Sequence, residues 1–261
     1  MGVVNVTPDS FSDGGDNLDP TIAVATARQL RDEGAALIDV GGESTRPGAD
    51  AVSVEEELGR VLPVLEQLAG IPASIDTSKA EVARQALAAG ALLVNDVTAL
   101  RGDPGLAGAI ADAGAYVCLM HMQGEPRTMQ VAPRYDDVVG EVAAFLEERL
   151  GVAVAAGIPE DHVCLDPGIG FGKTPDQNLE LIRGLERLCR MGRPILVGLS
   201  RKSTLARALG DPSAKVGTDA ASVGAAVAAF DRGATIFRAH AVAVHVEALA
   251  AAAAIERGSV T

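Results

Sequence analysis

The chain has 261 residues, of which 48% are hydrophobic and 22% are charged, so it can build a sizeable core. Aromatic residues make up only 3% and Trp is absent, which leaves Ala, Val, Leu and Ile to form that core. The formal net charge of −13 argues against nucleic acid and anionic membrane surfaces as partners, because both attract basic proteins.

Short runs rich in Val, Ile and Leu recur along the whole chain and predict strands. Most of these runs are continuously apolar rather than alternating, which is typical of parallel strands buried on both faces. In chain order they cover residues 2–6, 36–42, 72–77, 92–96, 116–121, 162–168, 194–200 and 235–240.

Segments with helical periodicity fill the intervals between the strands. They cover residues 21–33, 53–68, 78–89, 136–156 and 177–190, and Ala-rich helices are expected over 216–232 and 241–256. Successive strand starts are about 33 residues apart, the length of one strand, one helix and two short connections. The pattern predicts a (β/α)8 TIM barrel in a single domain spanning residues 1–261, with an open doubly wound sheet as the alternative.

The cysteines and the apolar tracts indicate in which cellular compartment the protein is expected. Cys118, Cys164 and Cys189 lack CxxC spacing and are expected to be reduced thiols. No signal-peptide pattern opens the sequence, and the longest apolar tract, residues 241–255, is too short to cross a bilayer. The sequence therefore predicts a soluble, cytoplasmic protein.

Nearly every predicted strand carries a polar residue at its C-terminal end. In a barrel these ends converge on one mouth, where such folds build their sites. A single Asp after a strand is more often a helix cap than a catalyst, but polar groups at so many strand ends together indicate a site. They are Asn5, Asp39 with Glu43, Asp76, Asn95 with Asp96, His121, Asp166, Ser200 to Lys202, and Arg238 with His240.

These polar residues fall into groups of different chemistry. Asp76, Asn95 and Asp166 supply mainly hydrogen-bond acceptors, which suit a flat heterocycle with amino and ring N–H groups. A cationic group suits a phosphate or pyrophosphate. Its members are Arg46, Lys202, Arg238 and His240. Asn5 and the aspartates of the loop after it offer oxygens to Mg²⁺, which few protein ligands usually hold together with substrate phosphates.

Two patterns that mimic other sites are set aside. The stretch GIGFGKT (168–174) is similar to a phosphate-binding loop, but Pro167 occupies the position of the first required glycine. His240 and His245 are five residues apart and lack the HExxH spacing of a zinc site.

Taken in order, the motifs at the strand ends resemble the dihydropteroate synthase family of pterin-binding (β/α)8 enzymes over essentially the whole chain. They are NVTPDSFSDGG (5–15), DVGGESTRPGA (39–49), SIDT (74–77), VNDV (94–97), DPGIGFGKT (166–174), GLSRKS (198–203) and RAH (238–240). The resemblance implies a step of folate biosynthesis, in which 6-hydroxymethyl-7,8-dihydropterin pyrophosphate and p-aminobenzoate give 7,8-dihydropteroate and pyrophosphate. It also implies a dissociative (SN1-like) reaction.

The resemblance implies roles for individual residues. The pterin side comprises Asp76, Asn95, Asp166, Phe171 and Lys202. The pyrophosphate side comprises Asn5, Arg46, Arg238 and His240, with Asn5 as a ligand of Mg²⁺. The p-aminobenzoate side comprises Phe11, Thr45, Arg46, Pro47, Phe171, Lys202 and Ser203. Catalysis is assigned to Asp76, Lys202, Arg238 and His240, with Asp9 or Asp13 as a loop carboxylate that stabilises the cation.

The polar, glycine-containing loops 5–15 and 43–49 are expected to be lids that close over the substrates and exclude water. A homodimer is also expected, because the family is usually dimeric and the last two helices carry small residues that permit close packing. Both expectations follow the resemblance.

The sequence departs from the family pattern at three places. Ala241 follows His240 where the family usually has Asp, and Thr204 follows SRKS where it usually has an apolar aromatic residue. The first strand starts at Met1 and is shorter than usual, so either residues are missing upstream or the barrel floor is less closed there.

Two alternatives stay open at this stage. A methyltetrahydrofolate methyltransferase-like enzyme would keep the acceptor set but has no need of SRKS or the two long loops. A non-catalytic pterin-binding paralogue is supported only by Ala241 and Thr204.

Overall fold

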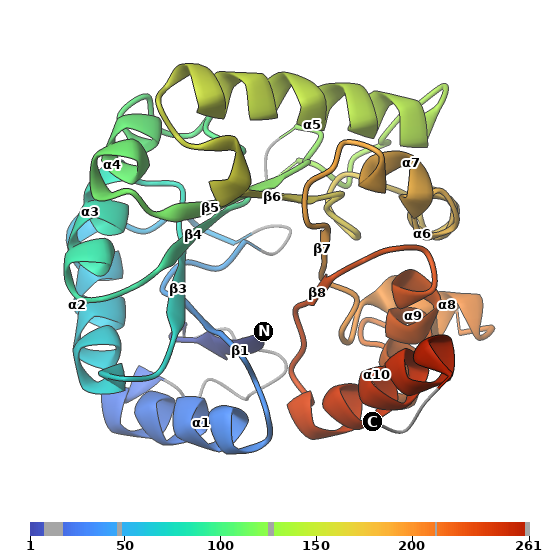
Figure 1. Ribbon diagram of the computed structural model, residues 1–261, viewed down its shortest axis with the longest axis horizontal. Coiled ribbons are helices and arrows are strands. Elements are labelled where there is room, and N and C mark those ends of the chain that lie inside the picture. Colours follow the sequence, from blue (N-terminus) through green and yellow to red (C-terminus); the bar gives the residue numbers. More distant parts are fainter. Residues whose placement is uncertain (8–17, 46–48, 125–127, 212, 259–261) are drawn as a thin grey trace.

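The strands lie at the centre of the molecule with the helices around them (Figure 1). The structure is a computed structural model and describes residues 1–7, 18–45, 49–124, 128–211 and 213–258. Within these residues the strands are β1 (Gly2–Asn5), β2 (Ile38–Gly41), β3 (Ala73–Asp76), β4 (Leu93–Asp96), β5 (Tyr116–Met120), β6 (Val163–Asp166), β7 (Leu196–Val197) and β8 (Ile236–Phe237).

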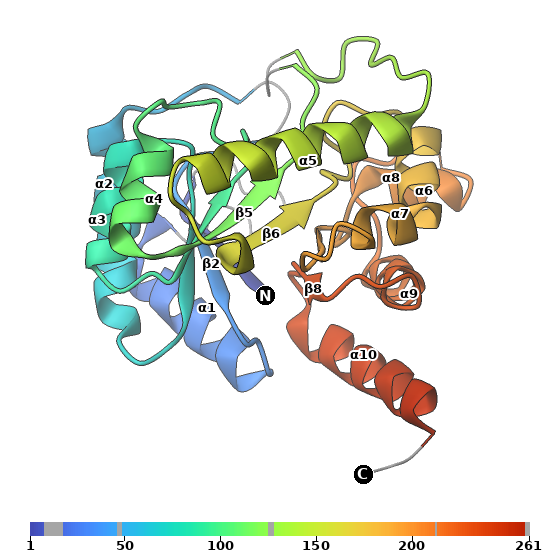
Figure 2. The same ribbon diagram turned by 45° about the horizontal axis from the view of Figure 1, so that its top comes forward.

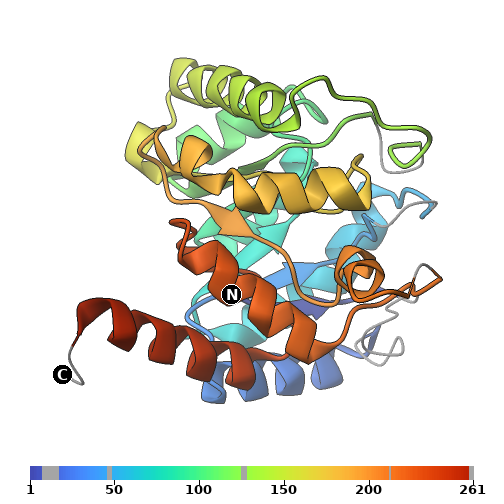
Figure 3. The same cartoon turned by 90° about the vertical axis from the view of Figure 1, so that its right-hand side faces the viewer.

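Helices connect consecutive strands, so that the chain alternates strand and helix as predicted. They are α1 (Pro20–Asp32), α2 (Val54–Leu65), α3 (Ala80–Ala88), α4 (Leu106–Ala113), α5 (Val138–Ala155), α6 (Pro175–Arg183), α7 (Leu185–Cys189), α8 (Ser203–Ala208), α9 (Asp219–Phe230) and α10 (Val242–Arg257), with short 3-10 turns η2 (Glu66–Leu68) and η3 (Glu160–His162). Figure 2 shows α10 extending away from the strands, and Figure 3 shows it beside α9.

Parallel pairing runs around the whole set of strands. Strands β1 to β6 form one parallel sheet in chain order, and β7 pairs with β8 in a second. Single parallel bridges join the two sheets at Leu165–Ile195 and at Gly2–Ala239. The amide of Ala239 donates to the carbonyl of Met1 at 2.9 Å. These bridges close the barrel, so the predicted TIM barrel is confirmed and the open doubly wound sheet is excluded.

Local sequence explains where the helices begin. Ser53 caps α2 by accepting a hydrogen bond from the amide of Glu56 at 3.1 Å, and acidic residues occupy the first turn beside the positive end of the helix dipole. Thr174 and Gln177 form a capping box at the start of α6. Each cap ends a loop that begins at the C-terminal end of a strand, and so it fixes where that loop joins the next helix.

The strands present different chemistry along the barrel axis. Side chains of a strand alternate between its two faces, and in β2 to β4 one set faces the helices while the other faces the interior. One end of the interior is apolar and contains Leu93, Cys118, Cys164 and Leu196. Polar residues such as Asp76 and Asn95 lie at the C-terminal strand ends. The barrel therefore has an apolar floor and a polar mouth.

Two predicted elements differ from the structure. The predicted helix 177–190 is two helices, because the chain turns at Gly184, where an added Cβ would lie 2.8 Å from Cγ2 of Val139. The seventh and eighth strands pair over only two residues each, far fewer than the predicted runs 194–200 and 235–240. None of the described helices is both long and apolar enough to span a membrane.

Candidate functional site

A pocket of about 800 Å³ opens at the C-terminal ends of the strands. It brings together ten of the residues expected from the sequence, which come from seven of the eight βα units. They are Asn5, Thr45, Asp76, Asn95, Asp166, Phe171, Lys202, Ser203, Arg238 and His240. The structure thus places acceptors and cations around one cavity, as the strand-end pattern predicted.

The remaining residues to which the resemblance assigns a role lie outside the part of the chain that the structure describes. They are Asp9, Phe11, Asp13, Arg46 and Pro47. The predicted lids 5–15 and 43–49 fall partly on the same segments, so these assignments stay predictions.

A buried carboxylate that sequence reasoning gave no role organises the pocket wall. Asp39 is fully buried and accepts hydrogen bonds from three neighbouring elements. Ser74 Oγ donates to Oδ1 at 2.6 Å, while Asn95 Nδ2 and Arg238 Nε donate to Oδ2 at 3.1 and 2.7 Å. Its signals in the sequence were a charged residue inside the apolar run 36–42 and a place among the polar residues near the strand ends.

Arg238 joins Asp39 to the expected pterin carboxylate Asp76. Its Nη2 donates to Asp76 Oδ2 at 3.1 Å, while Nε is held by Asp39. Burial alone would lower the pKa of Arg238, but the charges of Asp39 and Asp76 outweigh it and raise that pKa. The guanidinium is therefore a fixed cation between two carboxyl groups.

Burial makes the pocket residues Asp76 and Asp166 unusually weak acids. Removal from water, and then the charge of Asp39, raise the pKa of Asp76, although Arg238 opposes the shift. Burial likewise raises the pKa of Asp166 to about 6, against the hydrogen bond from the Gly168 amide and the charge of Lys202. Each carboxyl group can therefore release its proton when a ligand binds and then accept hydrogen bonds from N–H groups of that ligand.

Lys173, the lysine of the GIGFGKT stretch, points into its own loop. It is 2% exposed, and Nζ lies 3.0 Å from the carbonyl of Gly168, 2.9 Å from that of Phe171 and 2.9 Å from Nδ1 of His121. Burial lowers its pKa to about 7. The lysine thus fastens the loop 168–173 to β5, a role that the motif itself did not indicate.

Glycines let this loop approach its neighbours. Gly168 has φ of 66°, and an added Cβ would lie 1.9 Å from the carbonyl oxygen of His121. Gly170 has φ of 84°, and a Cβ there would lie 3.2 Å from Cδ of Lys202. Lys202 consequently lies over the ring of Phe171, with Nζ 4.3 Å from its centroid. This pair forms one side of the pocket.

Thr204 and Ala241, two of the three departures from the family pattern, have local consequences. The Thr204 hydroxyl is buried and accepts a hydrogen bond from Asn178 Nδ2 at 3.0 Å, and Asn178 Oδ1 accepts from the Gly170 amide at 2.8 Å. Thr204 therefore braces the pocket loop. Ala241 is the N-cap of α10, which has no side-chain cap.

His240 and Asn5, the residues expected to bind pyrophosphate, both line the pocket. Ser200 Oγ accepts the backbone amide of His240 at 3.1 Å and lies 3.0 Å from its Nδ1, which orients the ring. No group of three His, Cys, Asp or Glu side chains that could hold a metal exists among the described residues. Asn5, the expected ligand of Mg²⁺, lines the pocket and offers an amide oxygen, so Mg²⁺ at this place stays a prediction.

Comparisons with known proteins agree with this geometry. The model of the family "Pterin binding enzyme" matches residues 1–240. The chain is 48% identical to the dihydropteroate synthase of Neisseria meningitidis serogroup C, with 96% of this chain and 90% of the relative covered. Two solved structures of Xanthomonas albilineans dihydropteroate synthase are also similar. One contains 4-aminobenzoic acid (TM-score 0.88, 50% identity, 98% and 92% covered), and the other contains 7,8-dihydropteroate (TM-score 0.84, 47% identity, the same coverage). The chain belongs to the dihydropteroate synthase family of pterin-binding enzymes.

Proposed function

We propose that this pocket condenses 6-hydroxymethyl-7,8-dihydropterin pyrophosphate with p-aminobenzoate to give 7,8-dihydropteroate and pyrophosphate. The observation that carries the proposal is the shared cavity, in which Asp76, Asn95 and Asp166 face the same space as Arg238 and His240. The X. albilineans relatives hold 4-aminobenzoic acid and 7,8-dihydropteroate, a substrate and the product of this reaction.

The pterin ring binds between the acceptors and the Lys202–Phe171 pair. Its amino and ring N–H groups donate to the carboxylates of Asp76 and Asp166, and Asn95 both donates and accepts. Charge-assisted bonds of this kind contribute roughly 1.5–3 kcal/mol each. In the proposal Lys202 and Phe171, which contact each other, cover one face of the pterin ring.

Arg238 and His240 stabilise the departing pyrophosphate, together with Asn5. The bond from the pterin methylene carbon to pyrophosphate oxygen breaks first, in a dissociative step that leaves a cation conjugated with the ring. Arg238 faces the leaving group, and its hydrogen bond to Asp39 holds the guanidinium in position. The guanidinium therefore does not have to reorient as negative charge develops on the leaving group. Mg²⁺ supplies further neutralisation of the phosphate oxygens when it is bound.

The amine of p-aminobenzoate attacks the methylene carbon and then loses a proton, which completes the new C–N bond. Thr45 and Ser203 line the part of the pocket beside Lys202 and contribute to this second site. The expected residues Phe11, Arg46 and Pro47 complete it in the proposal. In the proposal Asp76 and a loop carboxylate, Asp9 or Asp13, stabilise the cation.

The decisive experiment supplies the purified chain with the pterin pyrophosphate, p-aminobenzoate and Mg²⁺ and measures dihydropteroate. Formation of dihydropteroate supports the proposal. Binding of pterin without turnover would instead favour a non-catalytic paralogue, and methyl transfer from methyltetrahydrofolate would favour the related methyltransferase class.

We also propose that the chain forms a homodimer through its small-residue helices α9 and α10. The exposed side chains of Val244 and Val246 on α10 support an interface there. Light scattering at micromolar concentration would contradict it by giving the monomer mass of 26.6 kDa.

A further inference from the structure

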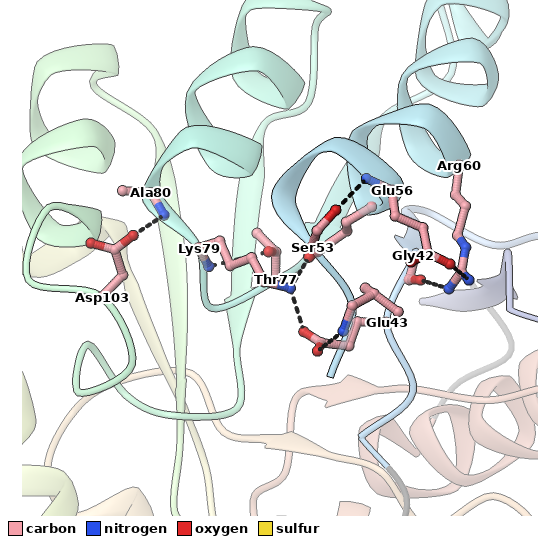
Figure 4. Close-up of polar contacts among 11 residues, drawn as sticks. Gly42, Glu43, Ser53, Glu56, Arg60, Thr77, Lys79, Ala80 and Asp103 are labelled. Carbon is pink, nitrogen blue, oxygen red and sulfur yellow. Dashed lines mark hydrogen bonds and ion pairs between the residues drawn. The ribbon is translucent and has the colours of Figure 1, made fainter. Parts of the chain in front are cut away.

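Lys79 links Glu43, which lines the pocket, to Glu57 of the neighbouring helix α2. It lies in the connection from β3 to α3, and its Nζ lies 2.8 Å from Glu43 Oε2 and 2.5 Å from Glu57 Oε2. Figure 4 shows Lys79 and Glu43 pointing toward each other from neighbouring connections. Glu57 belongs to the first turn of α2 and is fully buried.

Glu43 in turn holds both ends of the connection from β2 to α2. Its Oε2 meets Lys79, and its Oε1 accepts the backbone amide of Val52 at 3.1 Å. Glu43, Ser44 and Thr45 line the pocket at the start of this connection. The position of Ser44 and Thr45 therefore depends on where Glu43 is fixed.

The positive charge of Lys79 compensates the negative charges of Glu43 and Glu57. Burial alone would lower its pKa, but hydrogen bonds to Glu43 and Glu57 and their charges outweigh it and raise that pKa. Glu57 Oε1 has no hydrogen-bond partner among the described residues, so the ammonium group is the chief compensation for this buried carboxylate. Buried ion pairs are seldom better for stability than apolar residues of the same size. A role in geometry accounts for the arrangement better than a role in stability alone.

We propose that Lys79 is a positioning residue for the second substrate, because it fixes Glu43 and so holds Ser44 and Thr45 against the pocket. The inference rests on the proposed function, which assigns Thr45 to the p-aminobenzoate side. Within the described residues, the side-chain hydrogen bonds of Lys79 and Glu43 run to each other, to Glu57 and to the Val52 amide, and none of them involves the pterin acceptors Asp76, Asn95 and Asp166.

The test compares the two substrates in Lys79→Met, Glu43→Ala and the double variant. Without the link, the KM for p-aminobenzoate rises by about tenfold, equivalent to about 1.4 kcal/mol, while kcat and the affinity for a pterin analogue stay near those of the wild type. Glu43→Ala leaves the Lys79–Glu57 pair intact, so it keeps the test valid if Lys79→Met unfolds. Because Lys79 acts through Glu43, the double variant resembles the single ones instead of adding their effects.

Lys79→Arg and Arg84→Met serve as controls. Arginine keeps the charge beside both carboxylates and restores most of the lost affinity for p-aminobenzoate. Arg84 makes an exposed ion pair with Glu81 on α3, and removing it leaves both substrates unaffected. Equal losses for pterin and p-aminobenzoate, or additive losses in the double variant, would overturn the proposal. A wild-type chain that neither turns over nor binds p-aminobenzoate would overturn the proposed function as well.

Discussion

Arg238 and Asp39 are 199 residues apart in sequence, and their side chains meet with Nε 2.7 Å from Oδ2. Asp39 is fully buried and its Oδ1 is already held by Ser74. The carboxylate therefore cannot follow Arg238 if the arginine moves. This contact sets the direction in which the guanidinium faces the pocket.

Asp39→Asn is expected to lower kcat strongly while the chain still folds. The amide keeps the size of the carboxylate but removes its charge, so Arg238 loses its stronger anchor and turns toward Asp76. Misplacing one stabilising donor of this kind costs about 10²–10³-fold in kcat. Steady-state turnover with circular dichroism as the check on folding measures it. Ser74→Ala removes only one hydrogen bond to Asp39, and an equal loss of kcat in that variant would contradict the specific role of the Arg238 contact.

Sequence reasoning found the barrel and ten of the residues that line the pocket, because polar residues at the ends of apolar strands are informative by themselves. It did not find what Asp39 does, since its three partners come from β3, β4 and the segment after β8, and only the folded barrel brings them together. Lys173 was missed for a related reason. A lysine after a glycine-rich stretch normally reaches solvent or phosphate, whereas here the carbonyls of Gly168 and Phe171 turn inward to bind it.

The break in the helix predicted over 177–190 has a tertiary cause as well. Helical periodicity continues through Gly184, and nothing local except the glycine marks an end there. Val139 of α5 packs so closely that no side chain fits at position 184, which a single sequence does not reveal.

Pterin affinity is expected to depend on pH through Asp166. The pKa of this carboxyl is about 6 without ligand, because burial favours the protonated form. Below that pH the group is neutral and accepts hydrogen bonds from the heterocycle poorly, whereas above it the carboxylate accepts them well. The contribution of Asp166 to affinity is therefore full well above pH 6 and falls by up to about tenfold for each pH unit below it, while Asp76, whose pKa burial also raises, titrates separately.

Calorimetry with a pterin analogue between pH 5 and pH 8 measures this dependence. Asp166→Asn should bind more weakly at high pH and lose the step near pH 6, while Asp76→Asn should weaken binding but keep that step. A step that persists unchanged in Asp166→Asn would assign the titration to another group.

Lys173→Met is expected to destabilise the fold and to weaken pterin binding together. The apolar side chain leaves the carbonyl of Phe171 and Nδ1 of His121 without their donor in a buried place, while the carbonyl of Gly168 keeps the hydrogen bond from the Phe171 amide. The cost is at least about 2 kcal/mol of unfolding free energy, at about 1–3 kcal/mol for each unsatisfied group. Denaturant unfolding measures it, and Lys215→Met, which removes an exposed lysine, is the control for stability alone, because Lys215 also lines the pocket. Unchanged stability in Lys173→Met would show that the loop relaxes without its lysine.

Ala241→Asp is expected to stabilise the protein. Ala241 is the N-cap of α10 and offers no side-chain acceptor to the free amides of the first turn. An aspartate there supplies that acceptor and a negative charge beside the positive end of the helix, worth about 0.5–2 kcal/mol. For a chain of this size the melting temperature rises by about 2–4 °C per kcal/mol.

Ala243→Asp separates the two contributions of the cap. Ala243 is exposed in the first turn of α10, so an aspartate there adds the charge without occupying the N-cap position. Thermal unfolding of both variants at low and high salt compares them, because salt screens the charge effect more than the hydrogen bond. The N-cap variant should keep most of its gain at high salt, whereas the Ala243→Asp variant should lose it. Equal increases in melting temperature that disappear at high salt in both variants would contradict the prediction. They would mean that the added charge alone stabilises α10 and that a side-chain hydrogen bond at the N-cap contributes nothing.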